Sequence, residues 1–407
     1  MNIGIVGGGI AGLALALGLH RRGIGCTVYE AAPDVREIGV GITLLPHAMR
    51  EIAGLGLDDA ILAAGIENET SAFFNRFGQR IFAEPRGKHA GYPHPEIGIH
   101  RGKLHGILYR AALERLGPDL VRTDHQLVGH EQGDDGVTLQ FRRLSTGEAL
   151  PDASASVVIA CDGVNSTVRR AYYPDEQVAF TGINTWRGVT RSAPILGGRT
   201  YIRVGSIKTG KIVIYPIVDH DDGTQLINWI AEIERPGEAK NDWNKPGRTE
   251  DFLPIYESFR FDWLDVGQLI RDAEMVLEYP MVDKDPVARW TFGRVTLAGD
   301  AAHPMYPRGS NGSAQALIDA RVLADLLATY EPQAALAAFE AERLPATSAV
   351  VRTNRTSPPD VINLKVEELV GDRPFANLDD HISQDELRAL SDRYKSVAGF
   401  SQSEMSK

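Results

Sequence analysis

The chain has 407 residues and a formal net charge of −11 at pH 7, because 54 acidic side chains outnumber 43 basic ones. This length predicts two or three domains, and a hydrophobic content of 43% is typical of globular proteins and excludes wholesale disorder. An acidic chain without a basic run is a poor partner for nucleic acid. Two isolated cysteines, Cys26 and Cys161, exclude a disulfide scaffold, and the 11 histidines form no H-x-x-x-H or H-E-x-x-H pair, so no metal site is predicted.

Residues 3–19 form an uncharged apolar run whose length approaches that of a membrane span. A signal peptide carries positive charge before its apolar stretch, whereas here Arg21 and Arg22 follow it and glycines recur through it. We therefore interpret the run as a buried strand and helix of a cytoplasmic protein that has no membrane partner.

A glycine fingerprint links the first predicted strand, residues 2–6, to the helix that follows it. Gly7 permits a tight turn, Gly9 lets the backbone approach a pyrophosphate, and Gly12 lets the helix pack closely on the strand. The N–H groups at the start of the helix attract phosphate. A second predicted strand ends in Glu30, 18 residues after Gly12, where a carboxylate can accept hydrogen bonds from ribose hydroxyls. The unit predicts a dinucleotide but does not choose between NAD and FAD.

The alternation of strands and helices then breaks, which disfavours a simple NAD dehydrogenase. A glycine-rich stretch at residues 39–42 precedes a short helix that begins at about Pro46. Apolar residues at helical spacing predict an amphipathic helix over residues 104–116. Turn residues at 133–136, followed by alternating apolar side chains, predict a hairpin.

Two later buried-strand runs each end beside a glycine and an aspartate. They are residues 156–160, before Asp162-Gly163, and residues 294–298, before Gly299-Asp300. Ligands of an open α/β sheet bind beyond the carboxyl ends of its strands, so three such strand ends predict a site for an extended dinucleotide. Capping of the next helix is the simpler alternative for Asp162 and Asp300. Residues 307–312 then lead into a long apolar helix that ends near residue 330.

Residues 175–286 lose the helix–strand rhythm and predict an antiparallel sheet, with strands near residues 200–204, 212–217 and 226–233. Most aromatic residues here are expected to be core, and Tyr215 and Trp229 are candidates for the wall of a substrate pocket. An arginine can bind a substrate carboxylate through two hydrogen bonds. The strand arginines are Arg187, Arg191 and Arg203, of which Arg187 is the pocket candidate. A solvated strand face is the alternative for each.

The three motifs, in this order, resemble those of the single-component FAD-dependent aromatic hydroxylases, which are built like para-hydroxybenzoate hydroxylase. The resemblance covers about residues 1–350 and is closer still to the monooxygenases that hydroxylate phenazine carboxylates. Residues 84–87, 99–102, 186–190 and 279–286 carry this closer resemblance.

The resemblance implies an α/β fold in which a Rossmann-like FAD-binding domain is joined to a second, mostly antiparallel β-sheet substrate domain and C-terminal helices. The implied boundaries are 1–174 and 287–350 for the FAD-binding domain, 175–286 for the substrate domain, and 351–407 for a C-terminal helical segment and tail.

The resemblance also implies roles for single residues. The implied FAD-binding residues are Gly7, Gly9, Ala11, Gly12, Glu30, Gly41, Arg101, Leu127, Asp162, Asp300, Gly309, Asn311 and Gly312. Pro307 is placed along the flavin ring, which makes it a catalytic candidate. His47 is a second one, because many relatives have asparagine there; a structural histidine is the alternative. For Arg101 the alternative is a surface pair with Glu96 or Glu131.

The implied activity is that of a monooxygenase with FAD as its cofactor and NADH or NADPH as a transient co-substrate. Reduced flavin would react with O₂ to give a C4a-hydroperoxide, which transfers one oxygen atom to a small aromatic or heteroaromatic substrate. A phenazine-like carboxylate is the candidate substrate. A flavin oxidase or reductase without oxygen transfer and a non-catalytic flavin-binding module remain alternatives, and both a monomer and a homodimer are compatible with the sequence.

Overall fold

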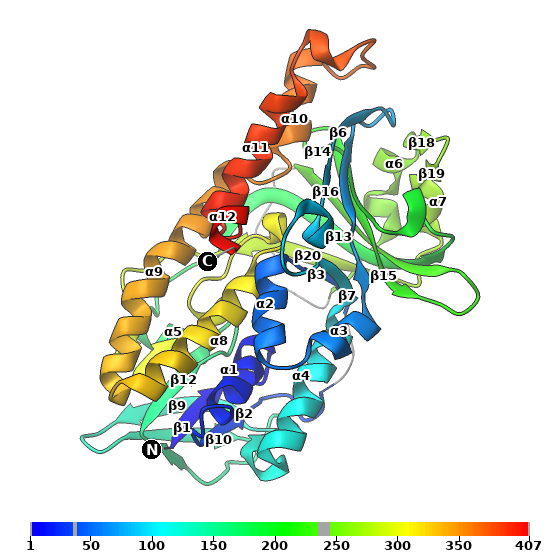
Figure 1. Cartoon of the computed structure of the whole chain (residues 1–407). Helices are drawn as coiled ribbons and strands as arrows, with labels where there is room; N and C mark the ends of the chain where they lie inside the picture. Colours follow the sequence, from blue (N-terminus) through cyan, green and yellow to red (C-terminus); the bar gives the residue numbers. More distant parts are fainter. Residues whose placement is uncertain (1, 36–38, 235–244, 406–407) are drawn as a thin grey trace.

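The structure, a computed structural model, describes residues 2–35, 39–234 and 245–405. Figure 1 shows a parallel sheet with its helices at one end of the molecule, a larger sheet at the other, and long C-terminal helices along one side. Within the described ranges, every helix is too short or too polar to span a bilayer.

The first sheet confirms the predicted Rossmann-like arrangement. Its strand order is β21-β22-β12-β1-β2-β8, and all neighbours are parallel except β21 and β22. The strands are β21 (Thr291–Phe292), β22 (Val295–Leu297), β12 (Val157–Ala160), β1 (Ile3–Val6), β2 (Cys26–Tyr29) and β8 (Val121–Arg122). Val6 pairs with Tyr29 on one side and Ala160 on the other, so the ends of these three strands meet at one edge of the sheet.

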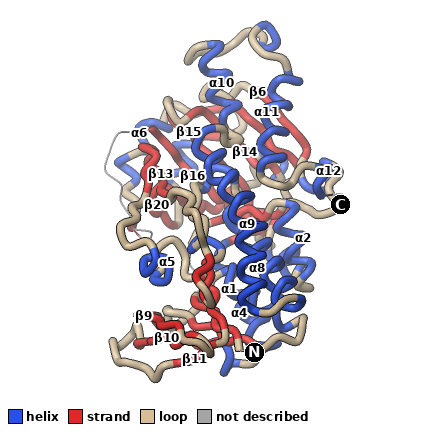
Figure 2. Tube along the Cα trace, turned by 90° about the vertical axis from the view of Figure 1, so that its left-hand side faces the viewer, coloured by secondary structure: helices blue, strands red, loops and turns tan. Residues whose placement is uncertain are grey.

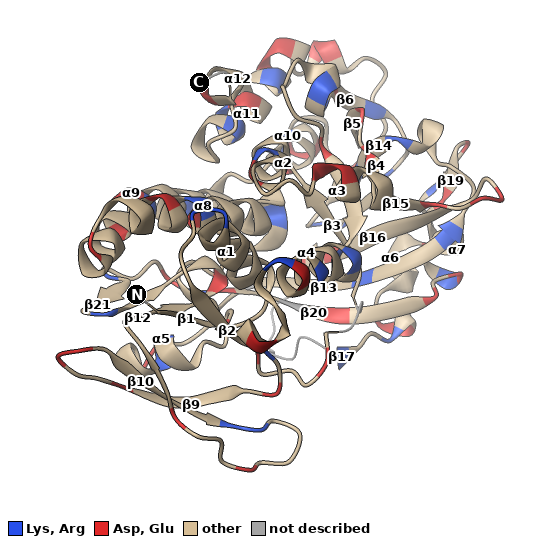
Figure 3. Ribbon diagram, turned by 60° about the horizontal axis from the view of Figure 1, so that its bottom comes forward, with Lys and Arg blue, Asp and Glu red and all other residues tan. Residues whose placement is uncertain are grey.

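Helices cover one face of this sheet and a small antiparallel sheet covers the other (Figure 3). The helices are α1 (Ile10–His20), α4 (Arg101–Leu116) and α8 (Gly312–Thr329), and the small sheet is β9 (Gln126–Gln132), β10 (Val137–Arg142) and β11 (Ala153–Ala155). Strand β1 and most of α1 are enclosed on all sides, which explains why residues 3–19 are uniformly apolar. The β9–β10 turn confirms the predicted hairpin.

An eight-stranded sheet forms the second unit, in the order β17-β20-β13-β16-β15-β14-β5-β6. Its strands are β5 (Thr70–Phe74), β6 (Arg80–Pro85), β13 (Ala179–Ser192), β14 (Thr200–Ser206), β15 (Gly210–Asp219), β16 (Gln225–Glu234), β17 (Lys245–Pro246) and β20 (Met275–Asp283). All neighbours are antiparallel except β5 and β14, which confirms the predicted sheet type. Strands β5 and β6 belong to this sheet although they lie outside residues 175–286, which corrects the predicted bounds of the substrate domain. The prediction missed them because local sequence does not show that a strand pairs with a partner so far along the chain.

A third, three-stranded sheet lies between the two units. It consists of β3 (Gly41–Leu44), β7 (Ile97–His100) and β4 (Ile66–Glu67), and it is flanked by α2 (Pro46–Gly54) and α3 (Asp58–Ala64). Its strands β7 and β4 contact β15 of the large sheet. Two short helices, α6 (Leu253–Tyr256) and α7 (Val266–Arg271), cover the outer face of the large sheet, and α5 (Thr167–Tyr172) follows β12.

The C-terminal helices are α9 (Pro332–Thr356), α10 (Val361–Val370), α11 (Gln384–Val397) and α12 (Gln402–Met405), and Figure 2 shows the long ones along one side of both units. The predicted boundary at residue 350 is corrected, because α9 continues to Thr356. The described part of the predicted tail is packed: Phe400 and Met405 are buried in one cluster with Leu45 and Tyr394.

Candidate active site

The turn after β1 has the shape that a bound pyrophosphate needs. Gly7 has φ +103°, and a Cβ atom there would overlap Cys161 O; a Cβ on Gly12 would overlap Gly7 O. A Cβ on Gly9 would meet no atom within 4 Å. Packing of the chain itself therefore requires Gly7 and Gly12, whereas Gly9 leaves open space at the N-terminus of α1, where N–H groups attract phosphate.

The Glu30 carboxylate contacts this turn. It accepts hydrogen bonds from Gly8 N at 2.6 Å and Ala32 N at 2.8 Å. A Cβ on Gly8 would be 2.9 Å from Glu30 Cβ, so this glycine, which the fingerprint spacing does not single out, is also required. His125 N donates to Glu30 O at 2.8 Å and brings the segment that contains Leu127 to this edge. The ribose role of Glu30 and the adenine role of Leu127 stay predictions.

The aspartates after the two later strands differ in their surroundings. Asp162 Oδ2 accepts a hydrogen bond at 2.7 Å from Thr167 N, the first N–H of α5, which agrees with the simpler alternative of a helix-terminus role; the N-cap residue itself is Ser166. Asp162 Oδ1 is buried without a partner among the described residues, and burial raises the pKa of this carboxyl group. Asp300, in contrast, is exposed. The turn before it packs on the start of α1, because a Cβ on Gly299 would be only 2.9 Å from Ala11 Cβ.

Asp319 of α8, which the sequence analysis did not select, fixes the turn at Gly299. Its Oδ2 accepts hydrogen bonds from Gly299 N at 3.0 Å and His303 Nε2 at 2.6 Å, and its Oδ1 accepts one from Arg343 Nε at 2.8 Å. Burial raises the pKa of this fully buried carboxyl, but His303 and Arg343 lower it further, to below its ordinary value. The charged form of Asp319 therefore holds the third motif in place.

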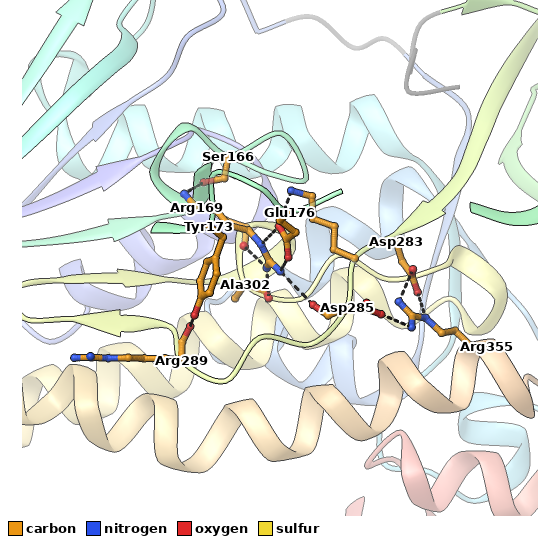
Figure 4. Close-up of polar contacts among 11 residues, drawn as sticks. Ser166, Arg169, Tyr173, Glu176, Asp283, Asp285, Arg289, Ala302 and Arg355 are labelled. Carbon is orange, nitrogen blue, oxygen red and sulfur yellow. Dashed lines mark hydrogen bonds and ion pairs between the residues drawn. The ribbon is translucent and has the colours of Figure 1, made fainter. Parts of the chain in front are cut away.

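Arg169 joins the second motif to the third (Figure 4). Its side chain is fully buried, and Nη1 donates to the carbonyl oxygens of residues 301 and 302 at 2.9 and 2.6 Å. Its Nε donates to Glu176 Oε2 at 2.7 Å. Nearby, Arg355 of α9 binds both oxygens of Asp283 at 2.7 and 2.8 Å. These charge-assisted bonds tie the turn after β22 to α5, and α9 to β20.

Two predicted cofactor residues lie on the small central sheet and the helix after it. Arg101 is exposed, and among the described residues no carboxylate lies within ion-pair distance of it. Glu96, its proposed surface partner, is instead 1% exposed and binds Arg86 Nη2 at 2.7 Å. Gly41 N donates to Asn228 Oδ1 at 2.6 Å, and a Cβ on Gly41 would be 2.7 Å from Asn228 Cβ. Packing on β16 explains this glycine, and cofactor contacts of both residues stay predictions.

The loop of residues 307–312 is held by the C-terminal helix α11. Pro307 begins a 3₁₀ turn, and a Cβ on Gly309 would overlap Tyr394 Oη. Asn311 is buried and donates from Nδ2 to Gly309 O at 3.1 Å and to Tyr394 Oη at 2.9 Å. The contact with Tyr394 therefore requires a glycine at 309, whatever its relation to the cofactor. The predicted cofactor and catalytic roles of this loop remain predictions.

His47 is fully buried against this loop. Its Nε2 hydrogen-bonds Asn311 Oδ1 at 2.9 Å, and its ring stacks on Phe400 with centroids 4.8 Å apart. Burial lowers the pKa of His47 to about 3, so the imidazole is neutral at physiological pH. Because Asn311 Oδ1 can only accept, Nε2 carries the proton. This setting favours the structural alternative for His47 over a catalytic role.

The predicted pocket residues of the large sheet separate into two faces. Tyr215 stacks on Tyr201 with centroids 4.9 Å apart, on the face toward the central sheet. Trp229 instead belongs to the core under α6 and α7, where its Nε1 donates to Thr190 Oγ1 at 3.0 Å. The prediction for Trp229 is therefore corrected, because its side chain points to the other face. Arg187 lies over an aromatic ring of β20 at 4.6 Å.

A small cavity lies between the large sheet, residues 307–312 and α11. Its volume of about 20 Å³ holds roughly one water molecule. The charged and hydroxyl-bearing residues of its wall include Glu84, Arg86, Glu96, Tyr201, Arg203, Ser310, Ser391, Tyr394 and Lys395. Of the three strand arginines, Arg203 lines this cavity, whereas Arg191 is exposed and binds Asp222 Oδ2 at 2.6 Å.

The three strand ends thus form an open edge with a glycine turn at a helix N-terminus, a carboxylate beside it and two exposed charged side chains, Arg101 and Asp300. This set fits an extended dinucleotide such as FAD. In agreement, the family model described as "FAD binding domain" matches residues 1–245 and 268–354. The chain belongs to this family of FAD-dependent aromatic hydroxylases and is a flavoprotein monooxygenase that binds FAD.

Relatives of known activity match nearly the whole chain. The phenazine 1,6-dicarboxylic acid hydroxylase PhzS of Lysobacter antibioticus is 36% identical over 404 residues, which cover 97% of each chain. The 3-amino-4-hydroxybenzoate 2-monooxygenase PtnB3 of Streptomyces platensis is 35% identical over 363 residues, or 87% of each chain.

Solved structures share the fold. HpxO of Klebsiella pneumoniae, in complex with FAD and uric acid, has a TM-score of 0.75 at 23% identity and covers all of this chain and 96% of its own. A salicylate hydroxylase in a substrate complex has a TM-score of 0.75 at 22% identity and covers all of this chain and 97% of its own.

Proposed function

We propose that the chain hydroxylates an aromatic or heteroaromatic carboxylate with NADH or NADPH as the reductant. One atom of O₂ enters a ring C–H bond to give a hydroxyl group, and the other leaves as water. The hydride of the nicotinamide and one proton supply the two electrons and the hydrogen that this balance needs. FAD, when bound, supplies the redox chemistry.

Arg203 is the observation that carries the substrate class. It is 7% exposed, its Nη1 donates to Ser71 Oγ at 2.7 Å, and its guanidinium lies over the rings of Phe73 and Tyr201 at 4.8 and 4.4 Å. Among the described residues, no carboxylate forms an ion pair with it, and burial lowers its pKa. A buried cation without a counter-ion is costly, so this site favours an anionic ligand.

The charges around Arg203 already balance without it. On one side, Arg86 and Lys395 bind the carboxylates of Glu84 and Glu96. On the other, two cations bind two carboxylates in a buried cluster of Lys211, Glu232, Arg308 and Asp360. The buried carboxylates and cations of each cluster balance, and the further partner of Lys395, Asp392 at 2.9 Å, is 59% exposed to solvent. No buried carboxylate of the two clusters is therefore left to offset the charge of Arg203.

A planar aromatic acid matches this chemistry at both ends. Its carboxylate can take two parallel hydrogen bonds from the guanidinium. Because the cavity of about 20 Å³ holds only about one water molecule, the wall formed by Phe73 and Tyr201 has to open before the ring can lie along it. Two of the relatives support this class, because they are named for their action on a phenazine dicarboxylic acid and on an aminohydroxybenzoate.

The test is a substrate screen on the FAD-loaded protein with benzoate, pyridine, quinoline and phenazine carboxylates and their matched carboxamides. NAD(P)H oxidation, H₂O₂ and product mass are followed together. The proposal predicts that an acid stimulates NAD(P)H oxidation and gains one oxygen atom, while its amide does so at least about tenfold less well. Stimulated oxidation with H₂O₂ but no oxygenated product for every acid would support the flavin oxidase alternative instead.

A further inference from the structure

Helix α11 supplies one wall of the cavity from beyond the part of the chain that matches the family, which ends at residue 354. Ser391, Tyr394 and Lys395 line the cavity, and their spacing places them on one face of the helix. Two of them are anchored on the opposite wall, because Ser391 Oγ and Lys395 Nζ bind Glu84 at 2.9 and 2.8 Å. The third, Tyr394, faces the loop of residues 307–312.

The Tyr394 hydroxyl connects this loop to α9. It accepts a hydrogen bond from Asn311 Nδ2 at 2.9 Å and donates one to Asn354 Oδ1 at 2.8 Å. Asn354 in turn donates from Nδ2 to Tyr306 O at 3.1 Å. The hydroxyl also packs directly on Gly309, where no Cβ fits. One network therefore holds the loop at both of its ends and in its middle.

The loop needs such support, because its backbone is strained. Ser310 has φ +54°, a left-handed conformation that residues with a Cβ atom adopt at a cost. Such conformations persist where surrounding contacts determine them. The loop also follows directly on the Asp300 turn and lines the Arg203 cavity, so it lies between the cofactor edge and the substrate cavity.

We propose that Tyr394 is a positioning residue, whose hydroxyl holds residues 307–312 in the geometry that aligns the cofactor edge with the substrate cavity. Helix α11 is then part of the active site and not only a C-terminal support. The effect on oxygen transfer rests on the proposed function, whereas the effect on the loop itself does not.

The experiment compares Tyr394→Phe with the parent by hydrogen–deuterium exchange of FAD-loaded protein, read on peptides that cover residues 306–312. Tyr172→Phe is the matched control, because it also removes a hydroxyl with two side-chain partners, His130 Nε2 and Gln132 Nε2, both at 2.9 Å. The proposal predicts about tenfold faster exchange of the loop in Tyr394→Phe and parent-like exchange there in Tyr172→Phe.

The second readout is the ratio of hydroxylated product to NAD(P)H consumed, with the best acid from the screen. Tyr394→Phe should lower this ratio and raise H₂O₂, while Tyr172→Phe should keep the parent ratio. Unchanged loop exchange, or an equal change in both variants, overturns the positioning role. Faster exchange with an unchanged ratio overturns its link to oxygen transfer. If no acid is hydroxylated by the parent, the proposed function fails, and the exchange result still decides the role of Tyr394 in the loop.

Discussion

Asp319→Asn should destabilise the protein strongly, although the substitution barely changes the side-chain volume. The carboxylate accepts three hydrogen bonds, from Gly299 N, His303 Nε2 and Arg343 Nε. An amide has a single acceptor oxygen and turns an NH₂ group toward a donor. It also leaves the buried Arg343 guanidinium without the one carboxylate that pairs with it among the described residues. Breaking a buried ion pair in this way costs about 3–5 kcal/mol of unfolding free energy.

Asp325→Asn is the control on the same helix. Asp325 is 46% exposed and pairs with Arg22 and Arg321 at the surface, where such pairs contribute no more than about 1 kcal/mol. Urea unfolding of both variants at pH 7, with the released FAD measured in parallel, makes the comparison. Equal stability of the two variants would refute the reasoning. The folded pKa of Asp319 lies below its unfolded value, so its contribution is complete above about pH 4 and is lost as the pH falls through the folded pKa.

Three further predictions concern the nucleotide edge and the buried histidine. Gly9→Ala should keep the parent's thermal stability without FAD, because the added Cβ meets open space, but it should bind FAD more weakly, because that space is where the phosphate is expected. Gly12→Ala should fail to fold, because its Cβ would overlap Gly7 O. Calorimetry and FAD titration distinguish the two variants. Glu30→Ala should weaken FAD binding by about one to two decades in a fluorescence titration, and an unchanged affinity would reduce Glu30 to a turn-stabilising residue. Between pH 6.5 and 5 the unfolding free energy of the parent should fall by about 1–2 kcal/mol, whereas that of His47→Gln should not show this fall. The reason is that His47 takes up a proton in the unfolded chain but not in the folded one, where its pKa is about 3. Parallel pH profiles of urea unfolding for parent and variant would contradict this.

The cofactor edge was predictable because each of its signals is local. At Gly7 a glycine turn follows directly on a buried strand, and Glu30 ends the next strand. At Asp162 an acid and then a glycine follow directly on a buried strand. Parallel pairing then brings these strand ends together without further information. The glycine at 309 shows the limit of this reasoning, because the residue that requires it, Tyr394, lies on a helix at the other end of the chain.

The substrate cavity was harder to predict because its wall is assembled from distant segments. The sequence offered three strand arginines, and alternation along a strand does not say which face meets the central sheet. Arg203 became distinct through the charges around it, which come from β6, α11 and the segment before α10. The prediction that Trp229 lines the pocket was wrong for the same reason, because an apolar residue in a strand can be buried on either face of the sheet.

The most direct test of the central claim is the ratio of kcat/KM for an aromatic acid to that for its carboxamide, in the parent and in Arg203→Gln. The proposal predicts an acid preference of about 10- to 100-fold in the parent that disappears in the variant. The variant should also be at least as stable as the parent without substrate, because it removes a buried charge that has no counter-ion. An acid preference that survives in a folded, FAD-loaded Arg203→Gln protein would contradict the assignment of this cavity as the carboxylate site.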